Sequence, residues 1–254
     1  MTDRDALYRA IIANPDEDTP RLIYADWLDE NGQPERAAFI RAQVEAVRAD
    51  PFGLQARNAV RRADEILKVH RAAWTRHLHG GFTEVPRFER GFVAHLSVEP
   101  TEFVPAAIAL FDAEPVQSLR LSRFLTTSGR PSLQPFFELP QLRQVRRLEI
   151  SPRLLADEEY EELSGCSRLA GLRDISLRDN PVPPGWLSDV LTGNVFPELT
   201  GLDVAEIPNL GPRLTAALGR ADHRALRRLN VSGVVFTSDQ LKDTLVSPCL
   251  RQVE

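Results

Sequence analysis

Acid–base catalysis needs carboxyl groups held in position, and three of them lie close together near the N-terminus. They are Asp26, Asp29 and Glu30. Asp26 and Glu30 are four residues apart, so they share one face of a helix. Such an acidic cluster fits a cation or a basic partner, and an enzyme built on this chain would have its site here. The alternative, which we favour, is a solvated helix face on which Asp26 caps or orients a neighbouring group.

Three histidines, His70, His77 and His79, are the residues that come nearest to a metal site. Zinc needs three or four converging ligands, each oriented by a further hydrogen-bond partner. His77 and His79 are two residues apart, so a regular helix would point them to different faces. The two cysteines, Cys166 and Cys249, are far apart and fit no metal or redox spacing. We therefore predict no metal and no cofactor, and interpret both cysteines as free thiols in a reducing compartment.

Catalytic motifs with a fixed spacing are missing from the sequence. It contains no G-x-S-x-G elbow, Walker A loop, G-x-G-x-x-G turn or H-E-x-x-H helix. The tryptophans Trp27, Trp74 and Trp186 are interpreted as packing residues and not as a platform for stacking bases. The sequence predicts no catalytic residues, and we expect the protein not to be an enzyme.

A repeated pattern determines which elements could position a binding surface. The pattern apolar-x-x-apolar-x-apolar begins at Val93, Val116, Val145, Leu172, Leu199 and Leu226, with a partial copy at Leu250. The intervals between these starting points are nearly constant and lie mostly in the leucine-rich-repeat range of about 20–29 residues. One copy also has the asparagine of such repeats, Asn180, three residues after its last apolar position. We therefore predict an α/β leucine-rich-repeat solenoid over residues 81–254, with about six to seven repeats.

Each copy has the composition of one strand followed by one helix. The short alternating segment predicts a parallel strand with its apolar side chains directed into the solenoid. The predicted helices outside it cover residues 104–112, 156–163, 184–191, 212–218 and 238–245. Some of them begin with a capping residue or an early proline, such as Ser238 and Pro184. A single repeat cannot bury its apolar face alone, so neighbouring repeats must stack.

The concave face of the predicted solenoid is its one extended, organised surface. The side chains between the apolar positions of each strand point outward there. The candidate partner-binding residues on this face are His95, Arg120, Arg147, Glu149, Asp174, Arg178, Asp203, Arg228 and Asn230. Their mixed charge suits a specific protein contact, whereas a groove for nucleic acid would be consistently basic. The alternative for any single residue is that it only solvates the sheet or pairs across adjacent strands.

Residues 1–80 show helical spacing throughout and predict a small all-α domain. We expect helices over 3–13, from Pro20 to the Asn31-Gly32 turn, over 35–48 and over 54–77. Thr19 is predicted to cap the second helix, with Pro20 at its first position. The residues expected to face inward are Leu7, Ile11, Leu22, Ile23, Trp27, Leu28, Phe39, Ile40, Val44 and Val47.

The sequence of residues 22–32, Leu-Ile-Tyr-Ala-Asp-Trp-Leu-Asp-Glu-Asn-Gly, is long and unusual. It is followed by Pro34-Glu35-Arg36-Ala37 and by Phe39-Ile40-Arg41. Together these residues resemble the bacterial repeat-companion domain, a short helical module found mainly beside leucine-rich repeats. The match extends roughly over positions 1–50, and Arg90-Gly91-Phe92-Val93 also looks typical of such proteins. The resemblance implies a helical domain followed by leucine-rich repeats, and it brings no catalytic residue with it.

An open solenoid exposes apolar surface and an unpaired strand at each end. We expect the helical domain to cover the N-terminal end. At the C-terminal end the partial seventh strand has no such cover. There the polar Arg251, Gln252 and Glu254 blunt the edge, or the edge is used for self-association.

Composition excludes several partners. The 254 residues have a formal net charge of −5, which gives no electrostatic reason to expect nucleic acid or an acidic membrane surface. No stretch approaches membrane-spanning length and the N-terminus has no apolar signal segment, so we expect a cytoplasmic protein. Our leading hypothesis is a non-catalytic protein-binding module that uses the concave face. A regulatory subunit or inhibitor of a partner enzyme is the first alternative, and an enzyme or metal-binding protein with a site in the helical domain is the second.

Overall fold

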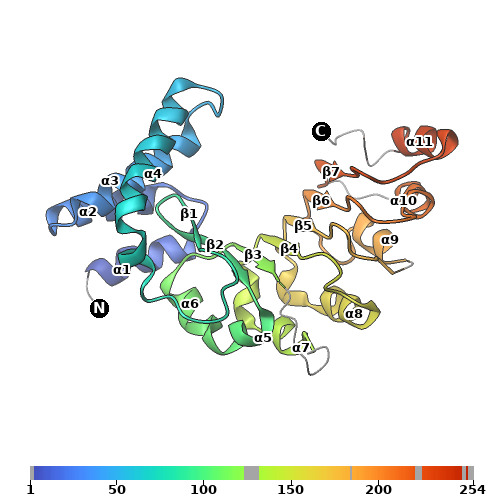
Figure 1. Ribbon diagram of the computed structural model, residues 1–254, viewed down its shortest axis with the longest axis horizontal. Coiled ribbons are helices and arrows are strands. Elements are labelled where there is room, and N and C mark those ends of the chain that lie inside the picture. The colour runs from blue at the N-terminus through green and yellow to red at the C-terminus, as the bar shows by residue number, and fades with distance from the viewer. Residues whose placement is uncertain (1–2, 123–131, 184, 221–224, 248–249, 251–254) are drawn as a thin grey trace. The chain divides into compact units, whose positions relative to one another are not determined.

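The computed structural model describes residues 3–122, 132–183, 185–220, 225–247 and 250 (Figure 1). The chain divides into two compact units that alternate along the sequence. The first, called the helical unit below, comprises Met1–His79, Val85–Leu96 and Ile108–Gln117. The second, called the sheet unit, comprises Gly80–Glu84, Ser97–Ala107 and Ser118–Glu254.

Four helices begin the helical unit, as predicted. They are α1 (Asp3–Ala13), α2 (Thr19–Glu30), α3 (Pro34–Arg48) and α4 (Leu54–Thr75). Pro20 and Pro34 lie in the first turns of α2 and α3, where the missing N–H costs nothing. The prediction that Thr19 caps α2 is wrong, because the helix starts one residue earlier: Thr19 is helical and Asp18 is the N-cap.

The core of the helical unit forms where α1, α2 and α3 meet. Its fully buried residues are Ile11, Tyr24, Ala25, Leu28, Ala37, Ile40, Val44 and Phe92. Leu7, Leu22 and Trp27 pack against this cluster while remaining partly exposed. Ile23 and Val47, which we expected to face inward, are 49% and 46% exposed. In α2 the inward face is rotated from the predicted one, so that Tyr24 and Ala25 are buried and Ile23 is not. The other predicted inward residues of α1 and α3 are buried or pack against the core.

A β-hairpin that was not expected from the sequence follows α4 in the helical unit. Its strands β1 (Arg87–Glu89) and β2 (Phe92–Val98) pair antiparallel, and Glu89 lies opposite Phe92 across a two-residue loop. Arg90 and Gly91 both have positive φ, 51° and 89°, as a type I′ turn requires. A Cβ on Gly91 would lie 2.4 Å from Cγ1 of Ile40, so only glycine allows the turn to approach α3 this closely.

The strands form one seven-stranded sheet in the order β1-β2-β3-β4-β5-β6-β7. Beyond the hairpin they are β3 (Ser118–Leu121), β4 (Arg147–Ile150), β5 (Asp174–Ser176), β6 (Gly201–Asp203) and β7 (Arg228–Asn230). Strands β3 to β7 pair parallel, each with the next in sequence. The predicted parallel sheet after an N-terminal helical region is therefore confirmed. The partial copy that begins at Leu250 lies almost entirely outside the described residues, as do Cys249, Arg251, Gln252 and Glu254.

Helical segments connect the strands. They are α5 (Pro100–Phe103), η1 (Val104–Ala106), α6 (Ala107–Ala113), α7 (Gln134–Phe137), η2 (Pro140–Gln144), α8 (Asp157–Gly165), η3 (Ser167–Leu169), α9 (Trp186–Leu191), α10 (Gly211–Leu218) and α11 (Ser238–Leu245). The helix predicted over 104–112 is interrupted, because Pro105 lacks the N–H of a helix interior and a 3₁₀ turn precedes α6. Pro184, the predicted start of α9, lies outside the described residues.

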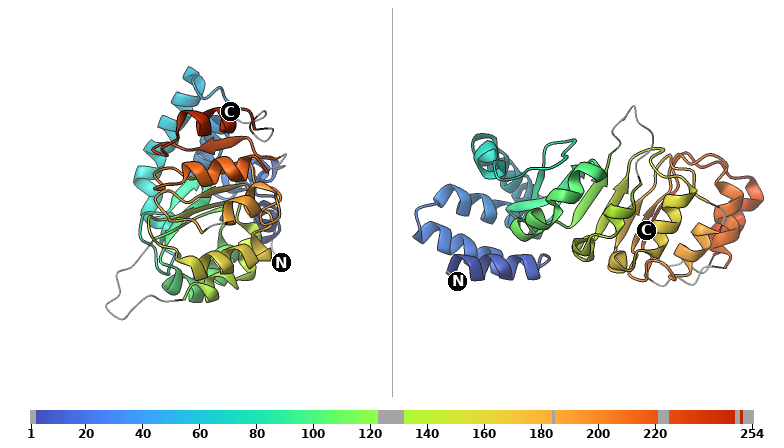
Figure 2. Two further views of the ribbon diagram at one scale, coloured as in Figure 1. Left: turned by 90° about the vertical axis from the view of Figure 1, so that its right-hand side faces the viewer. Right: turned by 90° about the horizontal axis from the view of Figure 1, so that it is seen from below.

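In the sheet unit, helices α7 to α11 lie on one side of strands β3 to β7 (Figure 1). Successive strand–helix pairs stack side by side, as the yellow-to-red part of Figure 2 shows. No described helix of this unit covers the other side of these strands, which we call the open face. Between sheet and helices the apolar strand positions are buried: Leu119, Leu148, Ile175 and Leu202 are at most 2% exposed. Tyr160, Trp186 and Phe196 pack edge to face in the same core.

Within the described residues, no helix is both long and apolar enough to cross a membrane.

Candidate interaction surface

The parallel register aligns the polar positions of β3 to β7 in two rows on the open face. One row contains Ser118, Arg147, Asp174, Gly201 and Arg228, and the other contains Arg120, Glu149, Ser176, Asp203 and Asn230. Successive side chains of a strand point to opposite sides, so burial of the apolar residue between the two rows directs both rows away from the core. Seven of the nine predicted partner-binding residues stand in these rows. His95 and Arg178 do not.

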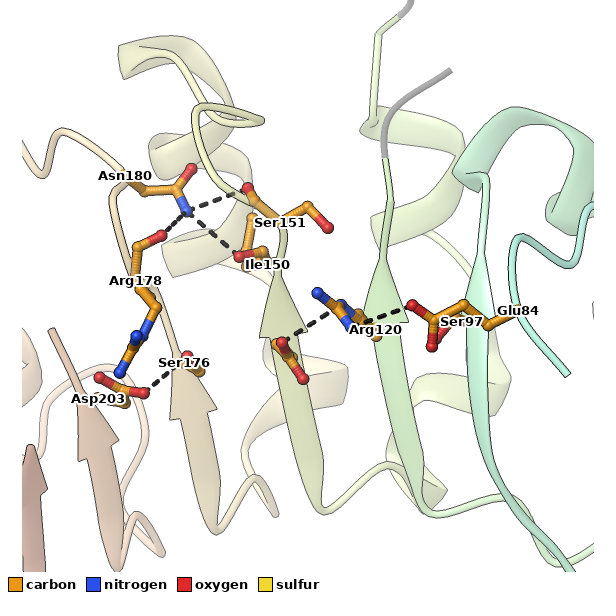
Figure 3. A network of polar contacts seen from close by, with 10 residues as sticks. Glu84, Ser97, Arg120, Ile150, Ser151, Ser176, Arg178, Asn180 and Asp203 are labelled. Atoms are coloured by element: carbon orange, nitrogen blue, oxygen red, sulfur yellow. Dashed lines mark hydrogen bonds and ion pairs between the residues drawn. The ribbon is translucent and has the colours of Figure 1, made fainter. Parts of the chain in front are cut away.

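Arg120 joins the β3 end of the open face into a network of ion pairs (Figure 3). Its Nη1 donates to Glu84 Oε1 at 3.1 Å, and its Nε lies 3.3 Å from Glu149 Oε1 on the neighbouring strand. The Ser97 hydroxyl donates to the other oxygen of Glu84 at 3.0 Å. The Arg120 side chain is 38% exposed, so it is held in place and is still open to solvent.

Asp174 forms a second network in which one carboxylate receives two arginines. Its Oδ2 lies 3.7 Å from Nε of Arg147 on β4, and its Oδ1 accepts a hydrogen bond from Nη2 of Arg228 on β7. Arg228 reaches this carboxylate across the intervening strand β6. The residue of β6 in this row is Gly201, where a Cβ would lie 2.1 Å from Asp174 Oδ1. The missing side chain of Gly201 therefore makes room for the contact between β5 and β7.

The remaining polar positions in the rows form shorter contacts. Asp203 Oδ2 accepts from the Ser176 hydroxyl at 3.2 Å, and its Oδ1 accepts from the Ala205 amide at 3.0 Å. Asn230 Oδ1 accepts from the amide and the hydroxyl of Ser232, at 3.1 and 2.7 Å. Most of the predicted surface is thus engaged in contacts within the molecule, which is the alternative that the sequence leaves open for single residues.

Arg178 differs from the other arginines of this face. It follows β5, its side chain is exposed, and it forms no ion pair with any described residue. Figure 3 shows the side chain extending from its backbone toward the region of Asp203. The backbone is fixed by Asn180, whose Nδ2 donates to the carbonyl of Arg178 at 3.1 Å. A positioned backbone with a guanidinium that no described acid engages leaves Arg178 available to a partner.

Asn180 is fully buried and connects two neighbouring loops of the sheet unit. Its Nδ2 also donates to the carbonyls of Ile150 and Ser151, at 3.3 and 3.1 Å (Figure 3). Its Oδ1 accepts from the amides of Leu154 and Leu155, at 3.0 and 3.4 Å. One side chain therefore satisfies backbone groups that would otherwise be buried without partners.

His95 belongs to the helical unit, and the other predicted partner-binding residues belong to the sheet unit. Its Nε2 lies 2.7 Å from Oε2 of Glu89, and its side chain is 17% exposed. Glu99, the residue that follows β2, is only 4% exposed. Its carboxylate caps α5 by accepting from the amide of Glu102 at 2.8 Å. Helix capping thus removes this acid from the surface.

The acidic cluster of α2 is engaged by an arginine of α3. Arg41 donates to Asp26 at 2.6 Å and to Asp29 at 2.5 Å. Glu30 is exposed on the same helix. This arrangement is an ion-paired helix surface, close to the solvated face that we favoured over an acid–base site.

The three candidate histidines contact different groups. His70 stacks on Trp74, with ring centroids 5.1 Å apart, and His77 Nε2 lies 3.1 Å from Oε1 of Glu114. His79 is exposed. In the part of the chain that the structure describes, no three histidine, cysteine, aspartate or glutamate side chains are grouped to hold a metal ion.

A buried polar cluster in the helical unit was not anticipated from the sequence. Glu114 is 2% exposed, and its carboxylate accepts from the Val93 amide at 3.0 Å as well as contacting His77. The Tyr8 hydroxyl donates to the Ala113 carbonyl at 2.6 Å, and burial raises the pKa of Tyr8. A depression of about 440 Å³ adjoins Tyr8 and His77. These residues lie far apart in the chain, so no sequence spacing connects them.

Two arginines that pack against aromatic rings, the buried Arg21 and the partly buried Arg36, were missed as well. Arg36 lies over the rings of Trp74, Phe92 and Phe88, at 4.5, 5.4 and 5.5 Å from their centroids. Arg21 lies 5.6 Å from the centroid of Phe92. Burial lowers the pKa of Arg36, and it lowers that of Arg21 to about 10. Cation–π contacts in the core thus account for Arg36 in the segment that resembles a repeat-companion domain.

Comparison with known proteins adds no relative: no family model, no curated protein and no solved structure matches the chain.

Proposed function

We propose that the protein is a non-catalytic protein-binding module whose open face receives the partner. In this proposal the sheet unit is a leucine-rich-repeat solenoid and the open face is its concave face. The N-terminal helices are a repeat-companion domain, in line with the resemblance of residues 22–41. A cytoplasmic location belongs to the same proposal, since Cys166 is a free, buried thiol and free thiols suit a reducing compartment.

The repetition of local geometry supports the solenoid. Arg147, Asp174, Gly201 and Arg228 are register partners, and the same sequence separation recurs from each to the next. The loops after these strands repeat too. The third residue after each strand has positive φ: Arg153 at 57°, Asp179 at 51°, Glu206 at 60° and Gly233 at 75°. Asn180 stands at the asparagine position of such repeats and bonds two neighbouring loops.

The observation that carries the binding function is the pair of aligned polar rows on a helix-free sheet surface. The ion pairs of Arg120 and Asp174 hold charged groups in fixed positions while leaving them partly exposed, at 38% and 31%. A partner that contacts pre-positioned groups loses less side-chain entropy on binding. Both rows contain acids and arginines, so the partner of best fit is a protein with mixed, complementary charge.

Replacing Arg178 tests this proposal most directly, because it leaves no described acid without its ion-pair partner. Arg147 and Arg228 are less suitable, since removing either changes the charge balance around Asp174. We expect Arg178→Ser to weaken capture of a partner from native lysate while circular dichroism stays unchanged. The matched control is Arg220→Ser, because Arg220 is exposed and lies just after α10, on the helical side of the sheet unit.

The outcomes of this experiment separate the hypotheses. A protein retained by the wild type and by Arg220→Ser, and lost with Arg178→Ser, supports binding at the open face. If the wild type and both variants retain the partner equally, the partner binds elsewhere and the proposed surface is rejected. If the captured partner is an enzyme whose rate changes in the stoichiometric complex, the module is a regulatory subunit or inhibitor.

A further inference from the structure

The last described strand–helix pair of the sheet unit, β7 with α11, repeats the one before it. Leu229 of β7 is the register partner of Leu202 of β6. Helix α11 (Ser238–Leu245) follows α10 (Gly211–Leu218) at the same sequence separation, at its first residue and at its last. Residues at this separation therefore occupy equivalent positions in the two pairs.

Equivalent positions differ sharply in burial. Leu214 and Leu218 of α10 are fully buried, whereas their equivalents in α11, Leu241 and Leu245, are 47% and 69% exposed. The loop residues behave alike: Val204 and Ile207 are at most 2% exposed, whereas Val231 and Val234 are only half-buried. The preceding pair has a neighbour on this side: β6 pairs with β7, and α10 contacts α11. The last pair therefore has the apolar side chains of an internal pair on a surface that nothing described covers.

This surface is large enough for an interface. Leu241, Leu245 and Val246 (72% exposed), with the half-buried side chains beside them, present on the order of 300–400 Å² of apolar surface, near the largest patch that soluble monomers usually expose. Strand β7 is the last in the sheet, so its outer edge offers unpaired backbone groups among the described strands. We call the patch and the β7 edge together the end face.

We infer that the end face binds the end face of a second copy of this chain, related by a twofold axis. The occupant must supply both a strand edge and an apolar helix flank, and the same end of a second copy supplies both. A twofold contact requires self-complementarity. An axis through Leu229 pairs Leu229 with itself and sets Arg228 opposite Asn230 of the second copy, so no two like charges meet along the strand.

The charges of α11 are self-complementary as well. Lys242 and Asp239 form an exposed ion pair at 3.6 Å, and Asp243 is the next residue along the helix. Two copies of α11 that run antiparallel across the axis bring Lys242 of each near an acid of the other. Because α11 carries both acids and a base, its charges favour pairing with α11 of a second copy. This inference does not depend on the open face or on its partner.

The first test is the mass of the full chain in solution as a function of concentration, by light scattering or sedimentation. We expect a monomer–dimer equilibrium, and we expect Leu241→Lys/Leu245→Lys to weaken it by roughly a hundredfold. Both leucines are exposed in the single chain, so circular dichroism and the thermal midpoint should not change. The matched control is Val69→Lys, because Val69 is 75% exposed on α4 and should leave dimerisation intact.

A second pair of variants tests the twofold arrangement itself. Lys242→Asp leaves only acidic charges on α11 and should weaken the dimer. Lys242→Asp/Asp243→Lys puts one basic residue back on the helix and should restore dimerisation. Hydrogen exchange over residues 228–246 should slow as the concentration rises. A chain that stays monomeric at every concentration overturns the inference. So does a dimer that tolerates the leucine substitutions or protects only other segments from exchange.

Discussion

Asn180 is the residue whose loss should reveal most about how the sheet unit is stabilised. Replacement by alanine removes two acceptor contacts and three donor contacts at once, all of them 3.0 to 3.4 Å long. Leu154 retains a second acceptor, because its amide also donates to the Ser151 carbonyl at 3.2 Å. The Leu155 amide, in a residue 2% exposed, keeps no other acceptor among the described residues.

The magnitude follows from these contacts. One buried amide without a partner costs about 1–3 kcal/mol. Three carbonyls lose a donor, and a small cavity replaces a fully buried side chain, which adds to this cost. We therefore expect Asn180→Ala to lower the free energy of unfolding by about 3 kcal/mol. The assay is equilibrium unfolding of the full chain in urea, followed by far-ultraviolet circular dichroism.

Asn230→Ala is the matched control for this prediction. The side chain of Asn230 accepts hydrogen bonds from Ser232, two residues away, and from no other described residue, and it is partly exposed. Its replacement should change the free energy of unfolding by less than about 0.5 kcal/mol. If the two variants lose equal stability, the backbone groups around Asn180 find other partners, and the predicted cost is refuted.

Two further predictions concern glycine and tyrosine residues. Gly91→Ala should destabilise the helical unit by about 3 kcal/mol, because it combines a positive φ with a collision against Ile40. Gly32→Ala has the positive φ but no atom within 4 Å of the new Cβ, so urea unfolding should show a loss of only about 1 kcal/mol, and equal losses would contradict the steric explanation. Burial raises the pKa of Tyr8 and Tyr160 above the ordinary 10.0, so the folded state favours the neutral form of both phenols. This preference contributes fully to the free energy of unfolding below pH 10, and the contribution is lost as the pH rises above 10. Tyrosinate absorbance from these two residues should therefore appear together with loss of circular dichroism, whereas ionisation of both in a folded protein would show that they are accessible.

The main elements of the sheet could be predicted because their signal is repeated. Apolar positions such as Leu148 and Ile175 recur at near-constant spacing and are buried between strand and helix, so period and burial agree. Strand β1 was missed because it is only three residues long and has no repeat of its own. Its one clear signal was local: a two-residue turn at Arg90-Gly91 suited to a type I′ hairpin.

Most residues of the open face could be predicted from the sequence, but the contacts between them could not. Alternation along a strand shows that Arg228 and Asp174 both point to the open face. It does not show that they meet, since they stand on strands that are not neighbours. That contact depends on Gly201, which the pattern treats as one more polar position. Glu114 and His77 are likewise distant in sequence, and only the folded chain brings these two side chains together.

The ion pair between Asp174 of β5 and Arg228 of β7 changes how the row of parallel strands should unfold. In a stack whose layers touch only their neighbours, the free energy is a sum of layer terms and nearest-neighbour terms, and the terminal layer frays alone. The Asp174–Arg228 ion pair adds a next-nearest-neighbour term of about 0.2–1 kcal/mol, the usual size for an exposed pair. Fraying of β7 then also removes a charge partner two strands away. The last three strands are thereby coupled, and opening of that end becomes more cooperative than pairwise stacking alone would make it.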